Sequence, residues 1–417
     1  MIKYKYLQAQ SFSMKLGIAG STGNVGKQTL QVIDDLQKMG YDYEIVWLGC
    51  NKNIDEIENQ INKYKPQFVS VIDYEKADEL RARTDIPVYS GKDGLRELIK
   101  LDSYDGFVNT ITGTAGLEPT VDAIKNKKTI YLANKETLVA AGPLIMDLAK
   151  KYIPNPNDPS GTRIIPFDDE PAAIHDCLRG RSKESIDKII ITCSGGALHD
   201  LSREEIKNAS LEEVLKHPTF VMSPGITINS GTLMNKGHEV IQAAYYFDVP
   251  LEKIEVLVHP GSYISSGIRN VQGRNFVEIC PPDVKYHIHY ALTYPNDTIK
   301  INFNNKKTDG VNLLELESLK LAHEPDVEKF PCFKYALDSY RIGGTMPCAV
   351  NAANEIAIDY FYNGKIKRVE EIENAVRHIL YTHKPIKNPT MDEILETDKK
   401  IKEETRKYLD EKNESSK

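Results

Sequence analysis

The stretch KLGIAGSTGNVG, residues 15–26, decides the first part of the fold. An apolar run, KLGIA, leads into Gly20, Gly23 and Gly26, and a helical pattern starts at about Asn24. Glycines at this spacing let the chain turn tightly, let backbone N–H groups approach a pyrophosphate and let the helix pack close to the strand. The helix N-terminus then faces the anion. The stretch predicts a dinucleotide-binding loop; the plainer alternative is an ordinary glycine turn.

Strand-like and helical patterns go on alternating to about residue 150. Helices are expected over 24–39 and 54–63, and the further strand-like runs are YEIVWLG, PQFVSVID, DGFVNTIT and KTIYLAN. Alternation of this kind predicts a parallel, doubly wound α/β sheet. We therefore predict a Rossmann domain over residues 14–152, with residues 1–13 as an extension outside it.

The segment IPNPNDPSGT, residues 153–162, interrupts this pattern and predicts a domain boundary. A second, catalytic α/β domain is predicted over 163–294, with a helix at LMNKGHEVIQAAYYF and strands at RIIPFDD, DKIIITCSGG, GITINSG, IEVLVHPGSYISS and RNFVEI. Polar turns predict a linker over 295–312, and helical patterns predict a small C-terminal α-helical domain over 313–417. The charged tail is typical of a solvated, fraying helix.

Composition excludes several classes of protein. The length of 417 residues fits two to three domains at about 150 residues each. The net charge of −7 and the lack of a basic segment with interleaved aromatics argue against nucleic acid as a partner. No apolar run comes near the ~18 residues of a membrane helix. The six cysteines are spread too widely for a metal clip or a disulfide framework, and the first residues lack a secretion signal, so we expect reduced thiols and a cytoplasmic protein.

The end of the second predicted strand favours NADP over NAD. NAD sites typically have an acidic residue there, which binds the ribose 2′-hydroxyl. The strand instead continues into Asn51, Lys52 and Asn53, and a cation suits a 2′-phosphate better; alternatively, Lys52 is only a solvated loop charge. The predicted cofactor contacts are Gly20, Ser21, Thr22, Gly23, Asn24, Val25, Gly26, Asn51, Lys52, Asn53, Asn134 and Glu136.

Asp168, Asp169 and Glu170 follow the strand RIIPF. Side chains alternate along a strand, so Asp168 and Glu170 can point to one side, where two carboxylates repel unless a cation or a proton joins them. Mg²⁺ and Mn²⁺ take oxygen ligands of this kind. An acidic triplet by itself is more often a solvated turn or a helix cap, so a third ligand is needed, and Glu239 is the candidate.

Glu239 closes a segment that also suits a phosphate. Asn235 and Lys236 lie one helical turn before it, and the hydroxyl of Ser230 comes at the start of the segment. The alternative is a surface ion pair with a helix cap. Ser194, in a Ser-Gly-Gly strand end, adds a weaker candidate for an anion loop.

Two further residues are candidates for substrate contact. Lys135 closes the last clear strand of the first domain, where ligands of doubly wound sheets bind, although it could equally be a surface lysine. His217 lies between a helix end and a loop, where it could bind substrate or cap carbonyls.

Together these pieces resemble the 1-deoxy-D-xylulose 5-phosphate reductoisomerase family, the NADPH- and metal-dependent enzymes of isoprenoid precursor synthesis. The resemblance extends from about residue 15 to 385, and its segments occur in the family's order: GSTGNVG, TGTAGLEPTVDAI, LANKETLVAAG, PFDDE, CSGGAL, HPTF, NSGTLMNKGHEVIQA, VLVHPGSYI, CPPDVKYHIHYAL, FPCFKYAL and AVNAANEIA.

The resemblance implies a reaction and roles for these residues. The expected reaction converts 1-deoxy-D-xylulose 5-phosphate into 2-C-methyl-D-erythritol 4-phosphate with NADPH and Mg²⁺ or Mn²⁺, in a homodimer. Metal ligation is implied for Asp168, Glu170 and Glu239. Substrate binding is implied for Lys135, Asp169, Ser194, His217, Ser230, Asn235 and Lys236, with HPTFVM as part of a lid over the substrate.

Several positions depart from the family pattern, and they gather around the expected substrate pocket. They are Asp169 in place of Ser, Pro171 in place of His or Asn, Phe220 in place of the lid Trp, Ser223–Gly225 in place of Gly-x-Lys, and Asn229 and Gly231 in place of Asp and Ala. Two alternatives therefore stand beside the leading hypothesis: a related NADP-dependent reductoisomerase or dehydrogenase acting on a different phosphorylated sugar, and a non-catalytic NADP-binding regulator.

Overall fold

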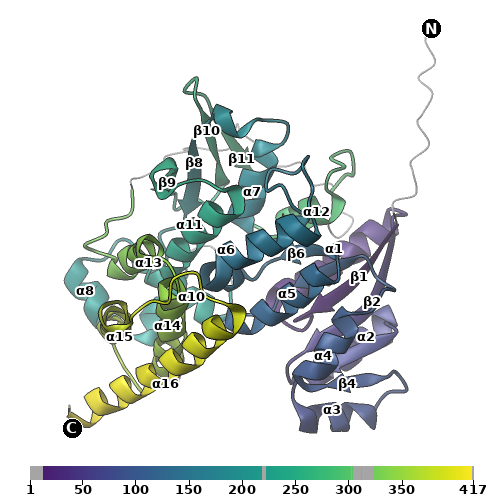
Figure 1. The fold of residues 1–417 in the computed structure, drawn as a ribbon, viewed down its shortest axis with the longest axis horizontal. Helices are drawn as coiled ribbons and strands as arrows, with labels where there is room; N and C mark the ends of the chain where they lie inside the picture. Colours follow the sequence, from purple (N-terminus) through teal and green to yellow (C-terminus); the bar gives the residue numbers. More distant parts are fainter. Residues whose placement is uncertain (1–12, 218–221, 302, 304–310, 312–323, 416–417) are drawn as a thin grey trace.

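A parallel sheet of seven strands forms the N-terminal part of the molecule (Figure 1). The computed structural model describes residues 13–217, 222–301, 303, 311 and 324–415. The strand order is β4-β3-β2-β1-β5-β6-β7. The strands are β1 (Ser13–Ala19), β2 (Asp42–Cys50), β3 (Phe68–Val71), β4 (Val88–Ser90), β5 (Gly106–Asn109), β6 (Thr129–Leu132) and β7 (Ile164–Pro166). The predicted doubly wound α/β fold is confirmed, and the order reverses between β1 and β5, where such sheets bind their ligands.

Helices connect the strands of this sheet. Their bounds are α1 (Asn24–Lys38), α2 (Ile54–Tyr64), α3 (Tyr74–Arg81), α4 (Gly91–Ile99), η1 (Gly113–Gly116), α5 (Leu117–Lys125) and α6 (Lys135–Tyr152). The first two agree with the sequence prediction to within one residue. In α1 the apolar side chains of Leu30, Ile33 and Leu36 recur at helical spacing and are buried. The burial of this stripe holds the helix against the sheet.

The strand β7 belongs to the first sheet, which corrects the sequence analysis. The run RIIPFDD was assigned to the central domain because a proline-rich segment precedes it. In the structure Ile164 pairs with Ile130 of β6 and Pro166 with Leu132. The segment 153–162 connects α6 to β7, and a local pattern of prolines does not show which sheet the next strand joins.

A second, four-stranded sheet has the order β11-β10-β8-β9. Its strands are β8 (Ile186–Cys193), β9 (Ile254–Val258), β10 (Ile264–Asn270) and β11 (Asn275–Ile279); only β8 and β9 run parallel. The surrounding helices are α7 (Asp169–Leu178), η2 (Lys183–Ser185), α8 (Arg203–Asn208), α9 (Leu211–Val214), α10 (Pro224–Gly231), α11 (Met234–Phe247), η3 (Leu251–Lys253) and α12 (Lys285–Thr293).

One predicted strand in this region is a helix. The apolar alternation in GITINSG suggested a strand, but the segment forms most of α10. Pro224 stands at its first helical position, where a fixed φ favours a helix, and Ile228 is buried on the inner face. The predicted helix at LMNKGHEVIQAAYYF is confirmed as α11.

Four helices close the chain: α13 (Pro331–Ile342), α14 (Met346–Tyr362), α15 (Val369–Thr382) and α16 (Met391–Ser415). The prediction of a solvated tail is wrong for α16. Ile394, Ile401 and Leu409 are each buried to within 2% exposure, and the helix packs along α14. Three apolar side chains on one face anchor a helix whose overall composition is strongly polar.

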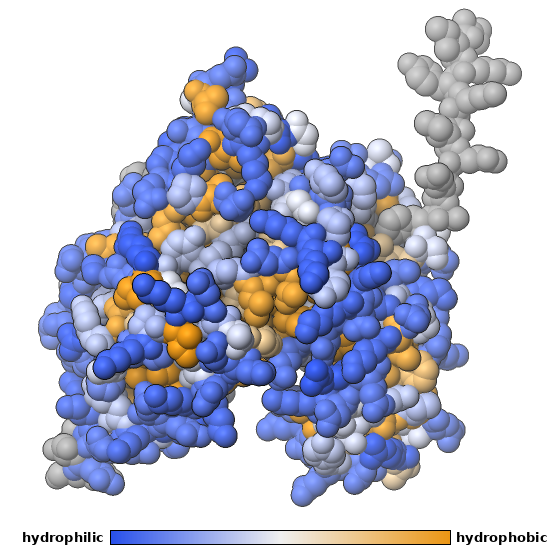
Figure 2. Space-filling view, viewed as in Figure 1, coloured by the Kyte–Doolittle hydropathy of each residue, from blue (hydrophilic) through white to orange (hydrophobic). Residues whose placement is uncertain are grey.

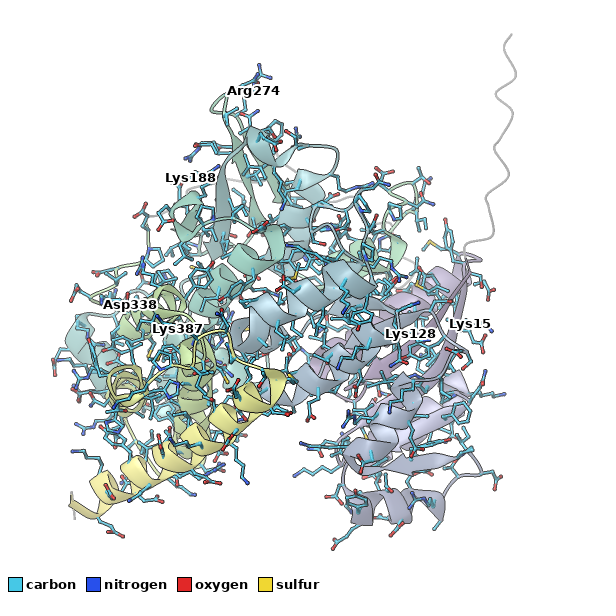
Figure 3. All side chains as sticks on the ribbon, viewed as in Figure 1. Lys15, Lys128, Lys188, Arg274, Asp338 and Lys387 are labelled. Atoms are coloured by element: carbon cyan, nitrogen blue, oxygen red, sulfur yellow. The ribbon has the colours of Figure 1, made fainter. Side chains whose placement is uncertain are left out.

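Polar side chains cover most of the face of the molecule that the figures show. Figure 2 shows a largely hydrophilic exterior on which hydrophobic side chains gather toward the middle of the view. The basic residues labelled in Figure 3, among them Lys15, Lys188 and Arg274, lie far apart around the molecule. Among the described residues, no helix combines the length and the apolar character that crossing a membrane requires.

Candidate active site

The glycine-rich loop lies at the carboxyl end of β1, at the reversal of strand order. Gly20 has a φ of +82°, and its Cα approaches Thr110 so closely that a Cβ would lie 2.8 Å from the Thr110 carbonyl oxygen. A Cβ on Gly26 would lie 2.4 Å from the Gly20 carbonyl oxygen. Gly23 caps α1 without a side chain. The loop thus leaves the N-terminal backbone of α1 open to an anion.

The other predicted cofactor residues divide into exposed and structural ones. Asn51 and Lys52 are exposed beyond the end of β2, and Asn53 caps α2 by accepting from the backbone N–H of Glu56. Within the loop, Ser21 turns inward and donates to Gln60 Oε1 at 2.7 Å, whereas Asn24 is exposed and Thr22 and Val25 are half-buried. The sequence pattern could not separate these two groups, because it does not show where side chains point.

Asn134 fastens the β6–α6 junction. Its Oδ1 accepts from the backbone N–H of Thr137 at 2.9 Å, and its Nδ2 donates to the carbonyl oxygens of Ile111 and Gly113 at 2.6 and 2.8 Å. Glu136 accepts from Asn134 Nδ2 at 3.1 Å, and burial raises the pKa of Glu136 to about 7. These contacts tie the segment after β5 to the start of α6.

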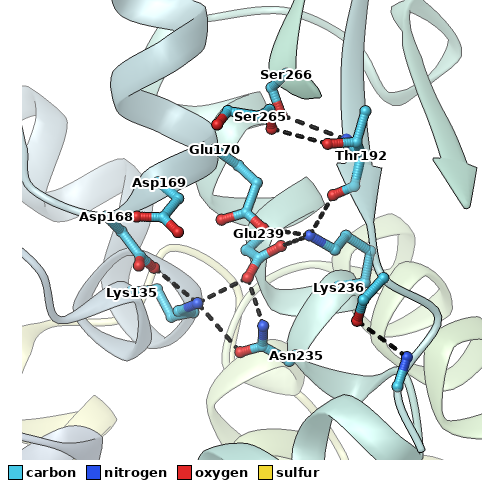
Figure 4. A network of polar contacts seen from close by, with 12 residues as sticks. Lys135, Asp168, Asp169, Glu170, Thr192, Asn235, Lys236, Glu239, Ser265 and Ser266 are labelled. Carbon is cyan, nitrogen blue, oxygen red and sulfur yellow. Dashed lines mark hydrogen bonds and ion pairs between the residues drawn. The ribbon is translucent and has the colours of Figure 1, made fainter. Parts of the chain in front are cut away.

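Asp168, Glu170 and Glu239 converge at the carboxyl edge of the sheet (Figure 4). Each offers a carboxylate oxygen, and the three oxygens lie within 4.8 Å of one another. Glu239 comes from α11 and its side chain is only 1% exposed. Glu239 lies 69 positions after Glu170 in the chain, and the packing of α7 against α11 brings their carboxylates together.

The first two carboxylates meet for a different reason from the one the sequence suggested. Asp168 and Glu170 were expected to share one side of a strand. In the structure β7 has ended at Pro166, and Asp168 is the N-cap of α7 while Glu170 lies in its first turn. Asp168 makes no side-chain capping bond, so its carboxylate is directed to the cluster instead. Asp169 points elsewhere and lies 3.1 Å from Nδ1 of His287.

Two buried lysines stand among the carboxylates. Lys135 Nζ lies 2.7 Å from Asp168 Oδ2 and 2.8 Å from Glu239 Oε1. Lys236 Nζ donates to Glu170 Oε1 and to the Thr192 carbonyl oxygen, both at 2.6 Å, and it also contacts Glu239. The Thr192 carbonyl is a part of the site that the sequence did not indicate, since a backbone acceptor leaves no side-chain signal.

The charges of the cluster shift the pKa values of its members. Burial raises the pKa of Glu170 to about 8, and repulsion from Glu239 adds to this. Burial also raises the pKa of Asp168, with Lys135 opposing it. For Glu239 burial is outweighed by Lys135 and Lys236, and its pKa falls to about 2. Three acidic groups against two ammonium groups leave the cluster one positive charge short, which suits a cation that replaces a proton.

The predicted phosphate residues form two neighbouring groups. Ser194 Oγ lies 3.1 Å from Nε2 of His217, and a Cβ on Gly196 would lie 2.5 Å from the Ser230 carbonyl oxygen, so the Ser-Gly-Gly turn packs directly on the end of α10. Asn235 instead bonds within the carboxylate cluster, accepting from Lys135 Nζ at 3.1 Å and donating to Glu239. Lys236 likewise lies with the carboxylates. The backbone of Lys236 follows the end of α10, but its ammonium group faces the carboxylates of Glu170 and Glu239.

The residues that depart from the family pattern are only partly described. Phe220 and the rest of residues 218–221 of the predicted lid lie outside the described residues. Asn229, in α10, accepts from Asn354 Nδ2 of α14 at 2.8 Å. Pro171 is buried in the first turn of α7. The described departures therefore lie on α7 and on α10 with its N-cap, and the ends of these two helices border the carboxylates and the Ser-Gly-Gly turn.

The fold and the site define a class of protein: a dinucleotide-dependent enzyme with a carboxylate cluster suited to a divalent metal ion at the edge of its nucleotide-binding sheet. The sequence matches the models for 1-deoxy-D-xylulose 5-phosphate reductoisomerase over residues 16–142, for its C-terminal domain over 164–247, and for the DXP reductoisomerase C-terminal domain over 279–404. The chain belongs to the 1-deoxy-D-xylulose 5-phosphate reductoisomerase family.

Individual relatives cover nearly the whole chain. The reductoisomerase of Caldanaerobacter subterraneus is 41% identical over 400 residues, 95% of this chain and 99% of the relative. Reductoisomerase 1 of Bacillus thuringiensis is 40% identical over 92% of this chain and 95% of its own. A crystal structure of DOX-P reductoisomerase in complex with NADPH, fosmidomycin and magnesium has a TM-score of 0.85 at 31% identity, covering 95% of this chain and 98% of its own. The Zymomonas mobilis enzyme in complex with NADPH has a TM-score of 0.83 at 29% identity, covering 95% and 99%.

Proposed function

We propose that this protein converts 1-deoxy-D-xylulose 5-phosphate into 2-C-methyl-D-erythritol 4-phosphate, with NADPH as the reductant and Mg²⁺ as the metal ion. The observation that carries the proposal is the meeting of Asp168, Glu170 and Glu239 at the carboxyl edge of a sheet that also presents the glycine-rich loop. Similarity over the whole chain to relatives of this activity supports it, as do solved relatives with bound NADPH and magnesium.

NADPH would bind across the reversal of strand order. The backbone of Gly20–Gly26 would receive the pyrophosphate at the start of α1, and exposed Lys52 would meet the 2′-phosphate beyond β2. Asn134 would act by holding the β6–α6 junction in place, since its polar atoms are already used within the protein. Of the predicted loop contacts, Ser21 would contribute through its backbone, because its hydroxyl is bonded to Gln60.

The carboxylates fit a divalent ion by their own chemistry. Asp168 Oδ2 and Glu239 Oε2 are buried without a hydrogen-bond donor of good geometry, although each lies beside a lysine ammonium. Burial, with repulsion from Glu239, raises the pKa of Glu170 to about 8. Mg²⁺ held by these three residues would supply a Lewis acid that polarises the oxygens of the bound ketose. Mn²⁺ has the same preference for oxygen ligands, and we propose it as an alternative ion.

The remaining residues would bind and orient the substrate. Lys135 would contact a substrate oxygen beside the metal site, because its ammonium reaches Asp168, Glu239 and Asn235 at once. Ser194, His217 and Ser230 would receive the phosphate group, with Lys236 beside them. Phosphate binding at a distance from the reacting carbons supplies energy for orientation. Burial lowers the pKa of His217, so it would act as a neutral hydrogen-bonding group.

We also propose that the protein works as a homodimer in the cytoplasm. The family resemblance supports the dimer, and six cysteines that form no disulfide support a reducing compartment. Light scattering coupled to gel filtration tests the first; localisation of the tagged full chain tests the second.

The test of the function is direct. The purified protein is incubated with Mg²⁺, NADPH and 1-deoxy-D-xylulose 5-phosphate, and NADPH consumption is followed at about 340 nm while the product is identified by NMR. We expect turnover that requires both NADPH and the metal ion. NADPH binding without turnover on this substrate, but with turnover on another phosphorylated sugar, would move the assignment to the altered-substrate alternative.

A further inference from the structure

A second group of potential metal ligands lies next to the carboxylate cluster. It consists of Glu278 in β11, Cys280 just after that strand, and His287 in the first turn of α12. His287 Nε2 lies 3.4 Å from Glu278 Oε2 and 3.9 Å from Cys280 Sγ, and all three ligand atoms lie within 4.8 Å of one another. Cys280 and His287 are 6% and 2% exposed. No residue of this group has a role in the proposed reaction.

The donor set differs in kind from that of Asp168, Glu170 and Glu239. A thiolate and an imidazole favour a zinc-class ion, whereas an all-oxygen set favours Mg²⁺. Zinc bonds of about 2.0 to 2.3 Å at tetrahedral angles place ligand atoms roughly 3.3 to 3.6 Å apart. The observed nitrogen–oxygen distance of 3.4 Å already meets this spacing, and the sulfur at 3.9 Å needs to move by only a few tenths of an ångström.

The other nitrogen of the His287 ring also has the environment of a metal-bound histidine. Such histidines usually turn their second ring nitrogen to a carboxylate or carbonyl, which fixes the ring. Asp169 Oδ1 lies 3.1 Å from His287 Nδ1, with Glu278 and Cys280 on the opposite side of the ring. Asp169 is one of the positions at which this chain departs from its family, where Ser is usual. The departure thus places a carboxylate behind a potential ligand.

We propose that Glu278, Cys280 and His287 bind a zinc-class divalent ion, with Asp169 as the carboxylate that orients His287. Water would complete the tetrahedron at the fourth position, and Ser265 Oγ lies 3.2 Å from the proposed sulfur ligand, Cys280 Sγ. The ion would join β11 to the start of α12. It would also hold Asp169 away from the neighbouring Asp168 and Glu170, which keeps a fourth negative charge out of the magnesium site.

The competing explanation is a proton. Burial lowers the pKa of His287, but Glu278 and Asp169 outweigh burial and raise it well above its usual value, so an imidazolium between two carboxylates could occupy the same place. A proton and a metal ion on Nε2 exclude each other. The two explanations therefore differ in whether the protein takes up a thiolate-bound metal ion.

The test uses Co²⁺ as a spectroscopic probe on the full-length protein after chelator treatment, with Mg²⁺ present in excess. A cobalt ion on a cysteine thiolate gives a charge-transfer absorption band in the near ultraviolet, and carboxylates do not. Cys280→Ser removes the proposed ligand. Cys193→Ser is the matched control, because Lys236 and Glu239 act on the Cys193 thiol, which therefore lies near the other cluster.

We expect one equivalent of Co²⁺ with a thiolate band in the wild type and in Cys193→Ser, and no band in Cys280→Ser. Zn²⁺ should displace the band stoichiometrically and raise the melting temperatures of the wild type and of Cys193→Ser, but not that of Cys280→Ser. Asp169→Ser should weaken Zn²⁺ binding by about 10- to 100-fold, as outer carboxylates of metal-bound histidines typically do. If Cys280→Ser does not fold, Glu278→Gln serves as the second ligand variant.

A wild-type protein that shows no thiolate band, or a band that persists in Cys280→Ser, would overturn the proposal. Loss of the band in Cys193→Ser alone would do the same, because it would place the cobalt ion at the other cluster. All of these results are independent of turnover, so they stand whether or not the proposed reaction is found.

Discussion

Replacing Glu239 with Gln is the sharpest perturbation of the carboxylate cluster. The substitution keeps the size of the side chain and removes one of three negative charges that face two lysines. We expect the variant to lose turnover while it keeps its fold and its affinity for NADPH, because Glu239 lies at the proposed metal site and not in the glycine-rich loop.

The structure sets the size of both effects. Two unit charges 4 Å apart interact by about 4 kcal/mol at an effective dielectric constant near 20, so a direct carboxylate ligand of a divalent ion contributes at least that much. Since about 1.4 kcal/mol is tenfold, kcat/KM should fall by about 10³-fold or more. Lys135 lies 2.7 Å from Asp168 and Lys236 lies 2.6 Å from Glu170, so both carboxylates keep a lysine partner in the variant. The loss of stability should therefore stay below the about 3–5 kcal/mol of an uncompensated buried charge.

The matched control is Glu373→Gln, which breaks a different ion pair. Glu373 of α15 accepts from both terminal nitrogens of Arg203 at 2.6 Å and contacts no residue of the site. Both variants and the wild type are compared by steady-state NADPH oxidation, NADPH binding by fluorescence, and thermal unfolding. We expect Glu239→Gln to lose rate with a small change in melting temperature, and Glu373→Gln to lose melting temperature with its rate retained.

Retention of more than about a tenth of the wild-type rate by Glu239→Gln would refute the assignment of this carboxylate to the metal ion. So would a loss of NADPH binding equal to the loss of rate, since that pattern would mean that the variant had damaged the cofactor site or the fold.

Three further predictions test other parts of the structure. Gly26→Ala places a Cβ 2.4 Å from the Gly20 carbonyl oxygen, so NADPH affinity measured by fluorescence titration should fall by at least about tenfold; an unchanged affinity would mean that the loop is not the cofactor site. Burial raises the folded-state pKa of Glu136 from 4.5 to about 7, so the folded state binds its proton more tightly than the unfolded state does. As the pH rises between about 4.5 and 7, the wild type should therefore lose up to about 3 kcal/mol of stability relative to Glu136→Gln. A difference in melting temperature that does not vary with pH would contradict this. Ile401→Ala removes a side chain that is 1% exposed between α16 and α14, and should cost about 2–5 kcal/mol and speed proteolysis of α16, whereas a solvated helix would show neither effect.

The sequence by itself determined the elements whose cause is local. The glycines at positions 20, 23 and 26 after an apolar strand predicted a tight turn. In the structure Gly20 has a positive φ, and Gly26 approaches the loop backbone so closely that a side chain would not fit. Alternating apolar runs specified the parallel sheet, and the apolar stripes of α1, α2 and α11 specified those helices to within a residue or two. The order of motifs along the chain was enough for the family.

The tertiary structure decided whatever depends on partners far apart in the chain. The place of β7 in the first sheet depends on pairing with β6, and α10 is a helix although its apolar residues alternate as in a strand. Asp168 and Glu170 face Glu239 because they begin a helix, so the expected convergence of the three carboxylates has a different local cause from the one the sequence suggested.

The same holds for the charges. The sequence contained Lys236 and His287, but only packing shows that the ammonium lies among carboxylates and that the imidazole lies between Glu278 and Asp169. A residue type fixes what a side chain can donate, accept or ligate. Its partner is fixed by the burial of surfaces from distant segments, because the free energy of burying a charge depends on every group brought beside it.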